Sequence, residues 1–234
     1  MPEMILAAAK PGYLPGMLFF ARMLRADIFV LADDIQFSKQ DWVNRTRIAN
    51  AAGELTLSVP VLTKGKGRQF IKDVRIDPTR HWAKKHQRAL QVNYAYAPYF
   101  DWYADLLAEV YYKRWEFLLD LNLALIDLLR RVLQIETPLH FASGISHRSG
   151  ATVSIIDIIR GFSCQKYLAE ERDKQFLDFS LFQSEVIRPL TLRFPPPHRH
   201  RLTEPYPYPL SLLHWLFHRG HEEVREMLES AIVR

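Results

Sequence analysis

The chain has 234 residues, of which 48% are hydrophobic and 24% charged, and it carries a net charge of +5 at pH 7. This composition is typical of a globular protein with a sizeable core, and it excludes disordered and fibrous classes. The single cysteine excludes an internal disulfide, and the dispersed charge without a zinc-finger or RNP motif argues against a nucleic-acid partner. Because no signal peptide and no apolar run of about 20 residues is visible, we expect a cytoplasmic protein without a membrane span.

The chain opens with the pattern of a strand–loop–helix–strand unit. Residues 4–9 form a short apolar run that is typical of a buried strand, and residues 27–32 repeat this pattern. Between them, residues 17–25 carry apolar side chains at helical spacing, with Arg22 and Arg25 predicted to face solvent. A crossover of this length with a helix in it predicts two parallel neighbouring strands and a right-handed connection.

Two carboxylates, Asp33 and Asp34, directly follow the second predicted strand. Ligands collect outside the carboxyl ends of parallel strands, so we expect these residues to lie beside the loop of residues 11–16, which is rich in proline and glycine. The polar residues that would line the same site come next in the chain: Gln36, Asp41, Trp42, Asn44, Arg45 and Arg47.

This opening stretch resembles the WbqC-like family, whose members occur in bacterial surface-polysaccharide and amino-sugar gene clusters. The family begins with a loop of type QPxYxPWxGFF, which residues 10–20 match in part, including Lys10 in the first position and Tyr13. It continues with ADxFVxxDDVQYxKxDWRNRNRI, which residues 26–48 match closely. The resemblance covers nearly the whole chain.

A hairpin is predicted next, because residues 42–49 and 55–61 alternate around a turn at residues 50–53. Arg45 and Arg47 are two positions apart, so on a strand they share one face. Two cations on one face suit either an anion site or a solvated sheet surface, and the family resemblance favours the anion site.

The middle of the chain predicts a helical insert, about residues 80–134, within a single domain that spans residues 1–234. Three helical patterns are visible, at residues 81–94, 98–111 and 115–133. The insert also carries family motifs: residues 82–86 match W-x-K-K-H and residues 94–100 match Y-x-x-A-P-Y-F. These matches make Lys85, His86 and Tyr94 candidate substrate contacts, while a packing role for His86 stays open.

The second half of the chain repeats the strand–helix–strand pattern. The predicted strands are residues 139–142, 166–168 and 186–194, and the predicted helices are residues 151–161, 176–182, a helix that starts near 206 and ends at Gly220, and 222–232. Together with the opening unit, this pattern predicts an α/β fold with a Rossmann-like, doubly wound, mostly parallel sheet, a helical insert and a small β-hairpin.

The second half also departs from the family pattern. The family has a loop of type Y-L-S-G-x-x-G where this chain has the acidic residues 167–171, YLAEE, without glycine. The loop of residues 195–201 carries His198 and His200, for which we favour a solvated basic loop over a metal site. Ser211 matches the family's helix start, where its hydroxyl would bond backbone N–H groups.

The resemblance implies an enzyme that transfers a glycyl or other acyl group to an amino sugar and forms an amide. Asp33, Asp34 and Asp41 would supply the base, Arg45, Arg47 and Lys85 would anchor phosphates, and Tyr13 and Trp42 would stack on the sugar or base. The remaining candidate substrate contacts are Lys10, Gln36, Asn44, His86, Tyr94 and Ser211. The substrate would be a nucleotide sugar or an activated amino acid, and the cofactor stays open between none, ATP or another nucleotide, with or without Mg2+.

A second hypothesis is a non-catalytic protein that binds a nucleotide sugar or assists polysaccharide assembly. The absent glycines after Leu168 favour it. The discriminating observation is whether Asp33, Asp34, Arg45 and Arg47 converge in a pocket with room for a ligand. If they instead pair off as buried ion pairs, a purely structural role for these residues is favoured.

Overall fold

The computed structural model describes residues 3–39, 41–194 and 210–234. The predicted basic loop at residues 195–201 and the predicted start of the helix near residue 206 lie outside the described residues.

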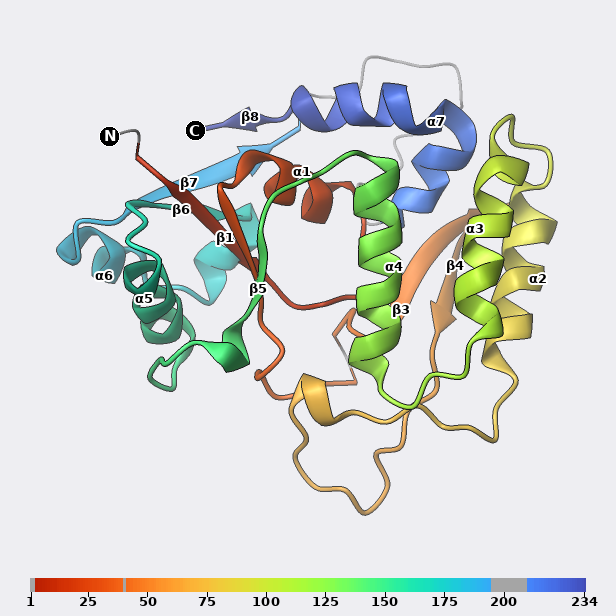
Figure 1. The fold of residues 1–234 in the computed structure, drawn as a ribbon, viewed down its shortest axis with the longest axis horizontal. Coiled ribbons are helices and arrows are strands. Elements are labelled where there is room, and N and C mark those ends of the chain that lie inside the picture. The colour runs from red at the N-terminus through yellow and green to blue at the C-terminus, as the bar shows by residue number, and fades with distance from the viewer. Residues whose placement is uncertain (1–2, 40, 195–209) are drawn as a thin grey trace.

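A mixed sheet forms the centre of the molecule (Figure 1), and within the described residues it has six strands in the order β5-β2-β1-β6-β7-β8. The strands are β1 (Ile5–Ala9), β2 (Ile28–Leu31), β5 (Leu139–Phe141), β6 (Lys166–Ala169), β7 (Arg188–Arg193) and β8 (Ile232–Val233). All neighbouring pairs are parallel except β7 and β8. The chain moves outward from β1 to β2 and β5, then crosses to β6 and β7, so the strand order reverses between β1 and β6.

Successive side chains of a strand point to opposite faces of the sheet, and helices cover both of these faces. In β1, Ala7 belongs to the core that contains α1 (Met17–Arg25) and α7 (Leu212–Glu229). Its neighbour Leu6 belongs to a second core with α5 (Ala151–Gly161) and α6 (Phe179–Ser184). The buried-strand patterns of the sequence therefore reflect two apolar faces.

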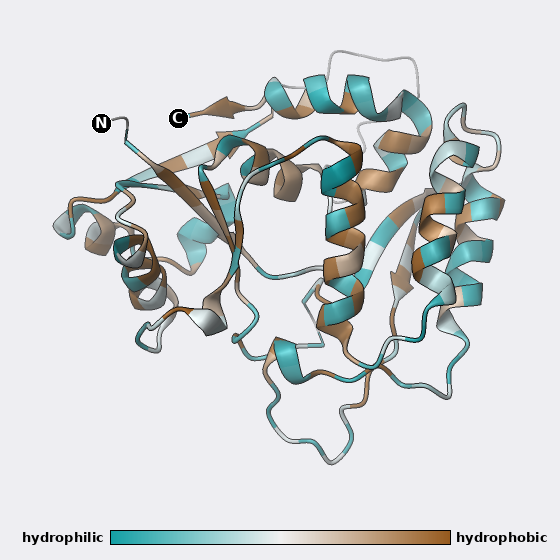
Figure 2. Ribbon diagram, viewed as in Figure 1, coloured by the Kyte–Doolittle hydropathy of each residue, from teal (hydrophilic) through white to brown (hydrophobic). Residues whose placement is uncertain are grey.

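The segment between β2 and β5 lies to the right of the sheet in Figure 1 and shares one hydrophobic core with it. It contains the hairpin β3 (Arg45–Asn50) and β4 (Gly53–Ser58) and the helices α2 (Trp82–Tyr94), α3 (Phe100–Tyr112) and α4 (Leu118–Val132). Figure 2 shows hydrophobic and hydrophilic stripes on α4, whose buried face joins the larger core. Three short 3-10 turns complete the structure: η1 (Ile71–Asp73), η2 (Ala142–Gly144) and η3 (Glu171–Gln175).

The two helices predicted around Gly220 are joined into α7 with a kink. Gly220 has φ 75° and ψ 171°, a backbone conformation that side chains with a Cβ avoid. A Cβ at this position would also lie 3.1 Å from the Tyr99 ring. The glycine stop seen in the sequence thus becomes a bend rather than an end.

The predicted α/β class, the mostly parallel sheet and the small hairpin are confirmed. Helices at residues 17–25 and 151–161 have the predicted bounds. Among the described residues, no helix combines the length and the apolar character that a membrane crossing requires.

Candidate functional site

The carboxyl ends of the parallel strands gather polar residues at one edge of the sheet. Lys10 follows β1, Asp33 follows β2, Ser143 follows β5 and Glu170 follows β6. The register keeps the first two close, because the Ala32 N–H donates to Ala9 O at 2.9 Å. This is the edge at which the sequence predicted a site.

Asp33 is buried, with 3% of its surface exposed, and both of its carboxylate oxygens are bonded. The Ser143 N–H donates to Oδ1 at 2.9 Å, and the Ser143 hydroxyl donates to Oδ2 at 2.6 Å. The backbone oxygen of Asp33 accepts from the Lys72 N–H at 2.9 Å. Asp33 therefore fixes the start of the loop after β5, and its role as a base stays a prediction.

Asp34 forms a carboxylate–imidazole pair with His147, a residue that the sequence reading did not single out. The distance from His147 Nε2 to Asp34 Oδ2 is 2.8 Å, and the two side chains are 16% and 20% exposed. His147 Nδ1 lies 3.1 Å from the backbone oxygen of Arg148. Burial lowers the pKa of His147, but the bonds to Arg148 and Asp34 outweigh it and raise the pKa above its usual 6.5.

Lys10 and Asp41 join the loop after β1 to the segment before β3. Lys10 Nζ lies 2.7 Å from Asp41 Oδ2, and both side chains are about one-third or more exposed. The Arg45 Nε–H donates to the backbone oxygen of Asp41 at 3.2 Å. The structure thus brings three predicted site residues together, with the Asp41 carboxylate paired to a cation.

Trp42 carries two guanidinium groups on its ring. The guanidinium carbons of Arg45 and Arg47 lie 4.7 and 4.4 Å from the ring centroid, within the range of cation–π attraction. Arg47 also forms an ion pair with Glu54 at 3.4 Å. The predicted shared face is confirmed by the intervening Thr46, which is buried and donates to Leu14 O at 2.9 Å.

The loop after β1 is held by Asn122 of α4, a polar residue that lies among the buried apolar side chains of that helix. Asn122 is fully buried, and its Nδ2 donates to Pro11 O and to Val43 O, each at 2.8 Å. The Tyr13 N–H also donates to Val43 O, at 3.1 Å. Asn44, another predicted site residue, donates from Nδ2 to Val59 O at 2.9 Å. One amide of the insert therefore sets the distance between the Lys10 loop and the Trp42 segment.

Tyr13 and His86 lie in the core rather than on the surface. The Tyr13 hydroxyl is 2.8 Å from His86 Nδ1 and 2.6 Å from the Tyr111 hydroxyl. Burial lowers the pKa of His86 to about 4, although a hydrogen bond with the Ser58 backbone opposes this shift. The structure gives both residues a packing role, and substrate contact by either stays a prediction.

We expect the protein to lose stability as the pH falls from about 6.5 to about 4. In this pH range the unfolded chain protonates His86 while the folded chain keeps it neutral. The contribution of neutral His86 to the free energy of unfolding is therefore fully present above pH 6.5 and decreases as the pH falls. One such residue contributes at most about 1.4 kcal/mol per pH unit. His214 adds to the effect, because burial and the nearby His218 lower its pKa to about 4.

Urea unfolding measured across this pH range would test this expectation. The His86→Gln variant should show a weaker dependence of the unfolding free energy on pH. An equal dependence in both proteins would contradict the assignment of His86.

Tyr94 and Ser211 are also buried and join the insert to α7. The Tyr94 hydroxyl accepts from the Ala49 N–H at 2.8 Å and lies 3.2 Å from His214 Nδ1. The Ser211 hydroxyl accepts from the Leu213 N–H at 3.3 Å, so the predicted helix cap is confirmed. The Ser211 N–H donates to Arg47 O at 2.8 Å, which fixes the backbone of one candidate anion-binding residue.

The two remaining predicted residues, Gln36 and Lys85, have exposed side chains. Gln36 pairs through its backbone with Phe70, and Lys85 lies on α2 one position before buried His86. A cavity of about 320 Å³ lies between the loop near Leu62 and the start of α4, and none of the predicted site residues lines it.

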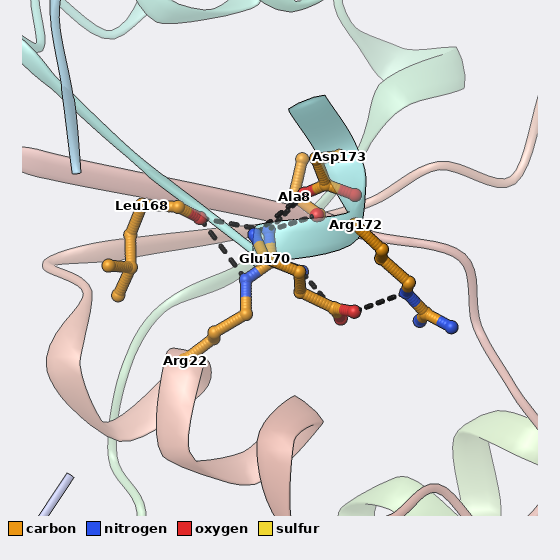
Figure 3. A network of polar contacts seen from close by, with 6 residues as sticks. All are labelled: Ala8, Arg22, Leu168, Glu170, Arg172 and Asp173. Carbon is orange, nitrogen blue, oxygen red and sulfur yellow. Dashed lines mark hydrogen bonds and ion pairs between the residues drawn. The ribbon is translucent and has the colours of Figure 1, made fainter. Parts of the chain in front are cut away.

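A buried ion network fills the point at which the strand order reverses (Figure 3). Arg22 of α1 is 2% exposed, so the prediction that it faces solvent is wrong. Its guanidinium donates to Ala8 O of β1 at 2.8 Å, to Leu168 O of β6 at 2.9 Å and to Glu170 Oε1 at 3.0 Å. Arg172 forms an ion pair with the same carboxylate. Arg22 therefore bridges the two strands beside which α/β proteins bind ligands.

The structure thus separates the predicted residues into groups. One surface cluster contains Lys10, Asp41, Trp42, Arg45 and Arg47. A second cluster contains Asp33, Asp34, Ser143 and His147. A signal for Ser143 and His147 was present in the sequence: the polar loop after the strand at residues 139–142 had to start at the edge that holds Asp33.

The chain is similar to known proteins over most of its length. Residues 10–226 match the WbqC-like protein family. A protein of Mycobacterium tuberculosis (strain ATCC 25618 / H37Rv), described as uncharacterized protein Rv1507c, is 32% identical over 183 residues, which cover 78% of this chain and 79% of that protein. No solved structure matches the chain. The family match spans most of the chain, including both clusters at the sheet edge, and the chain belongs to the WbqC-like protein family.

Proposed function

We propose that this protein is an amide-forming transferase that attaches a glycyl or other acyl group to an amino sugar during bacterial surface-polysaccharide or amino-sugar biosynthesis. The substrates would be a nucleotide sugar and an activated amino acid, and the enzyme would act in the cytoplasm. We further propose a single Rossmann-like, doubly wound domain with a helical insert at about residues 80–134. The observed strand order and the reversal between β1 and β6 support this architecture.

One observation carries the proposal: two clusters of complementary chemistry lie at one edge of the sheet. The first combines three cations, Lys10, Arg45 and Arg47, with the indole of Trp42. Asp41 and Glu54 pair with two of these cations, and the remaining positive charge suits an anionic ligand such as a nucleotide diphosphate. The second offers the carboxylate of Asp34, which is partly exposed and suits a base for an attacking amine. Lys10 and the Asp33–Asp34 pair follow the adjacent parallel strands β1 and β2, and we propose that a single ligand contacts both clusters.

Amide formation needs an anchor, a base and donors for the oxyanion that develops on the acyl carbon. The cationic cluster would supply the anchor, and Asp34 would supply the base. Asp33 and Asp41 were also candidate bases from the sequence. Their observed contacts suit a supporting role, in which Asp33 holds Ser143 and Asp41 holds Lys10. Trp42 would support the two guanidinium groups.

The alternative function, a non-catalytic sugar-nucleotide-binding or accessory protein, also has a supporting observation. Arg22 and Glu170 fill the reversal point between β1 and β6, where the ligand of many α/β enzymes binds. Such a protein would use the cationic cluster without the chemistry of Asp34.

A thermal-shift panel tests the proposed function. The panel contains a UDP-linked sugar with a free amine, UDP, glycine and ATP with Mg2+, applied to the wild type, Arg45→Ala and Arg131→Ala, an exposed arginine of α4 that serves as the control. We expect the nucleotide sugar to raise the melting temperature of the wild type and the control but not of Arg45→Ala.

A second step separates the enzyme from the binding protein. The wild type is incubated with the same nucleotide sugar and a glycyl donor, either glycine with ATP and Mg2+ or glycyl-coenzyme A, and the product is analysed by mass spectrometry. A glycylated sugar supports the transferase, and a dependence on ATP would make it the cofactor. Binding without product would favour the accessory protein, and no binding at all would contradict both functions.

A further inference from the structure

The loop between β5 and α5 positions His147 at the sheet edge, and hydrogen bonds anchor this loop on both sides of the histidine. On one side of His147, Ser143 donates two hydrogen bonds to Asp33. On the other side, the Arg148 side chain and N–H donate to the Asp157 carboxylate at 2.7 to 2.9 Å. Both flanks of His147 are therefore anchored independently of its bond to Asp34.

The pair remains open to a ligand. Asp34 is 20% exposed and His147 16% exposed at the side chain, whereas Asp33 beside them is buried. Ile35, an exposed apolar residue, directly follows Asp34 in the chain. A carboxylate–imidazole pair that is mostly buried but still partly exposed is a setting in which proton transfer to a bound substrate is effective.

The contacts of the imidazole indicate its protonation state. Nε2 faces the Asp34 carboxylate and Nδ1 faces the Arg148 backbone oxygen, and both of these groups are acceptors. An imidazole that donates from both nitrogens carries a positive charge. The charged groups that act on His147 are Asp34 from the end of β2 and Asp157 from α5, and both favour this form.

We propose that Asp34 and His147 are the acid–base pair of the transfer reaction, an inference that rests on the proposed function. The lone pair of the sugar amine attacks the acyl carbon and forms the C–N bond, and Asp34 accepts the proton that the amine loses. The bond between the acyl carbon and the leaving oxygen or sulfur breaks, and His147 gives its proton to that atom. Transfer of the proton from Asp34 to His147 then restores the starting state.

The test uses the transfer assay with the UDP-linked amino sugar and the glycyl donors named above. His147→Gln keeps a hydrogen-bond donor for Asp34 but cannot transfer a proton. Asp34→Asn removes the carboxylate that would accept the proton of the amine. Both should slow transfer by roughly 100-fold to 10,000-fold, while the shift in melting temperature with the nucleotide sugar stays as in the wild type. His140→Gln, a change in a β5 histidine that packs on Phe162, serves as the control and should leave the rate unchanged.

Two further readouts distinguish proton transfer from a structural role. The wild-type rate should decrease at alkaline pH as His147 loses its proton, and this decrease should be absent in His147→Gln. NMR titration of labelled histidine should show a pKa above 6.5 for His147 that falls in Asp34→Asn. Wild-type transfer with an unaffected rate or pH profile in the variants overturns the inference alone. A wild type that forms no product overturns the proposed reaction and this inference with it.

Discussion

Replacing Arg22 with methionine is expected to lower the free energy of unfolding by about 3 to 5 kcal/mol. The guanidinium lies between two strands and a carboxylate, and methionine would leave the buried Glu170 carboxylate without its main partner. It would also remove the donors to Ala8 O and Leu168 O, the links across the point where the strand order reverses. Urea unfolding of both proteins measures the difference.

Arg131→Met provides the matched control, because this arginine of α4 is exposed and, within the described part of the chain, its side chain bonds to the backbone of its own helix turn. It should change the unfolding free energy by no more than about 0.5 kcal/mol. The double variant Arg22→Met/Glu170→Leu should recover part of the loss, since no unpaired charge remains buried. A single Arg22→Met variant as stable as the wild type would show that the network adds nothing.

Replacing Asn122 with leucine is expected to cost about 2 to 4 kcal/mol. Leucine fills the space but donates nothing to Pro11 O and Val43 O, and Pro11 O would be left in the core without the amide that it now bonds. Val43 O keeps the Tyr13 N–H, so the larger loss falls on the loop after β1. The variant should therefore weaken nucleotide-sugar binding as well as stability, because Lys10 and Trp42 lose their common support.

Asn93→Leu is the control for this substitution. The Asn93 amide donates to Ala89 O within its own helix, α2, so its loss should have little effect on stability and none on binding. Calorimetric titration with the UDP-linked amino sugar at a temperature where each variant is folded separates the two effects. Unchanged affinity in Asn122→Leu would limit this residue to a structural role.

The opening unit could be predicted from the sequence because its signals are local. The apolar runs of β1 and β2, the helical spacing of α1 and the position of Asp33 and Asp34 depend on residues close in the chain. The alternation that places Arg45 and Arg47 on one face is equally local. These features required no knowledge of distant contacts.

The partners of these residues could not be predicted in the same way. His147 lies 113 residues from Asp34, and its role depends on β5 pairing with β2. Arg22 was expected to face solvent because its side chain is charged, and the pairing of β1 with β6 surrounds it with acceptors. Asn122 occupies an apolar stripe, and nothing near it in the sequence distinguishes a clamp from an isolated polar residue.

The place of β1 in the sheet has a consequence for how the chain reaches its folded state. Among the described strands β1 comes first in the chain, but one of its two edges pairs with a strand 161 residues later. Such distant pairing slows folding, because a long segment must be closed into a loop before the contact forms. Until β6 is made, the central strand keeps one row of backbone groups uncovered, as an edge strand does. The nascent chain would therefore depend on shielding of that strand edge until residues 166–169, which form β6, have been synthesised.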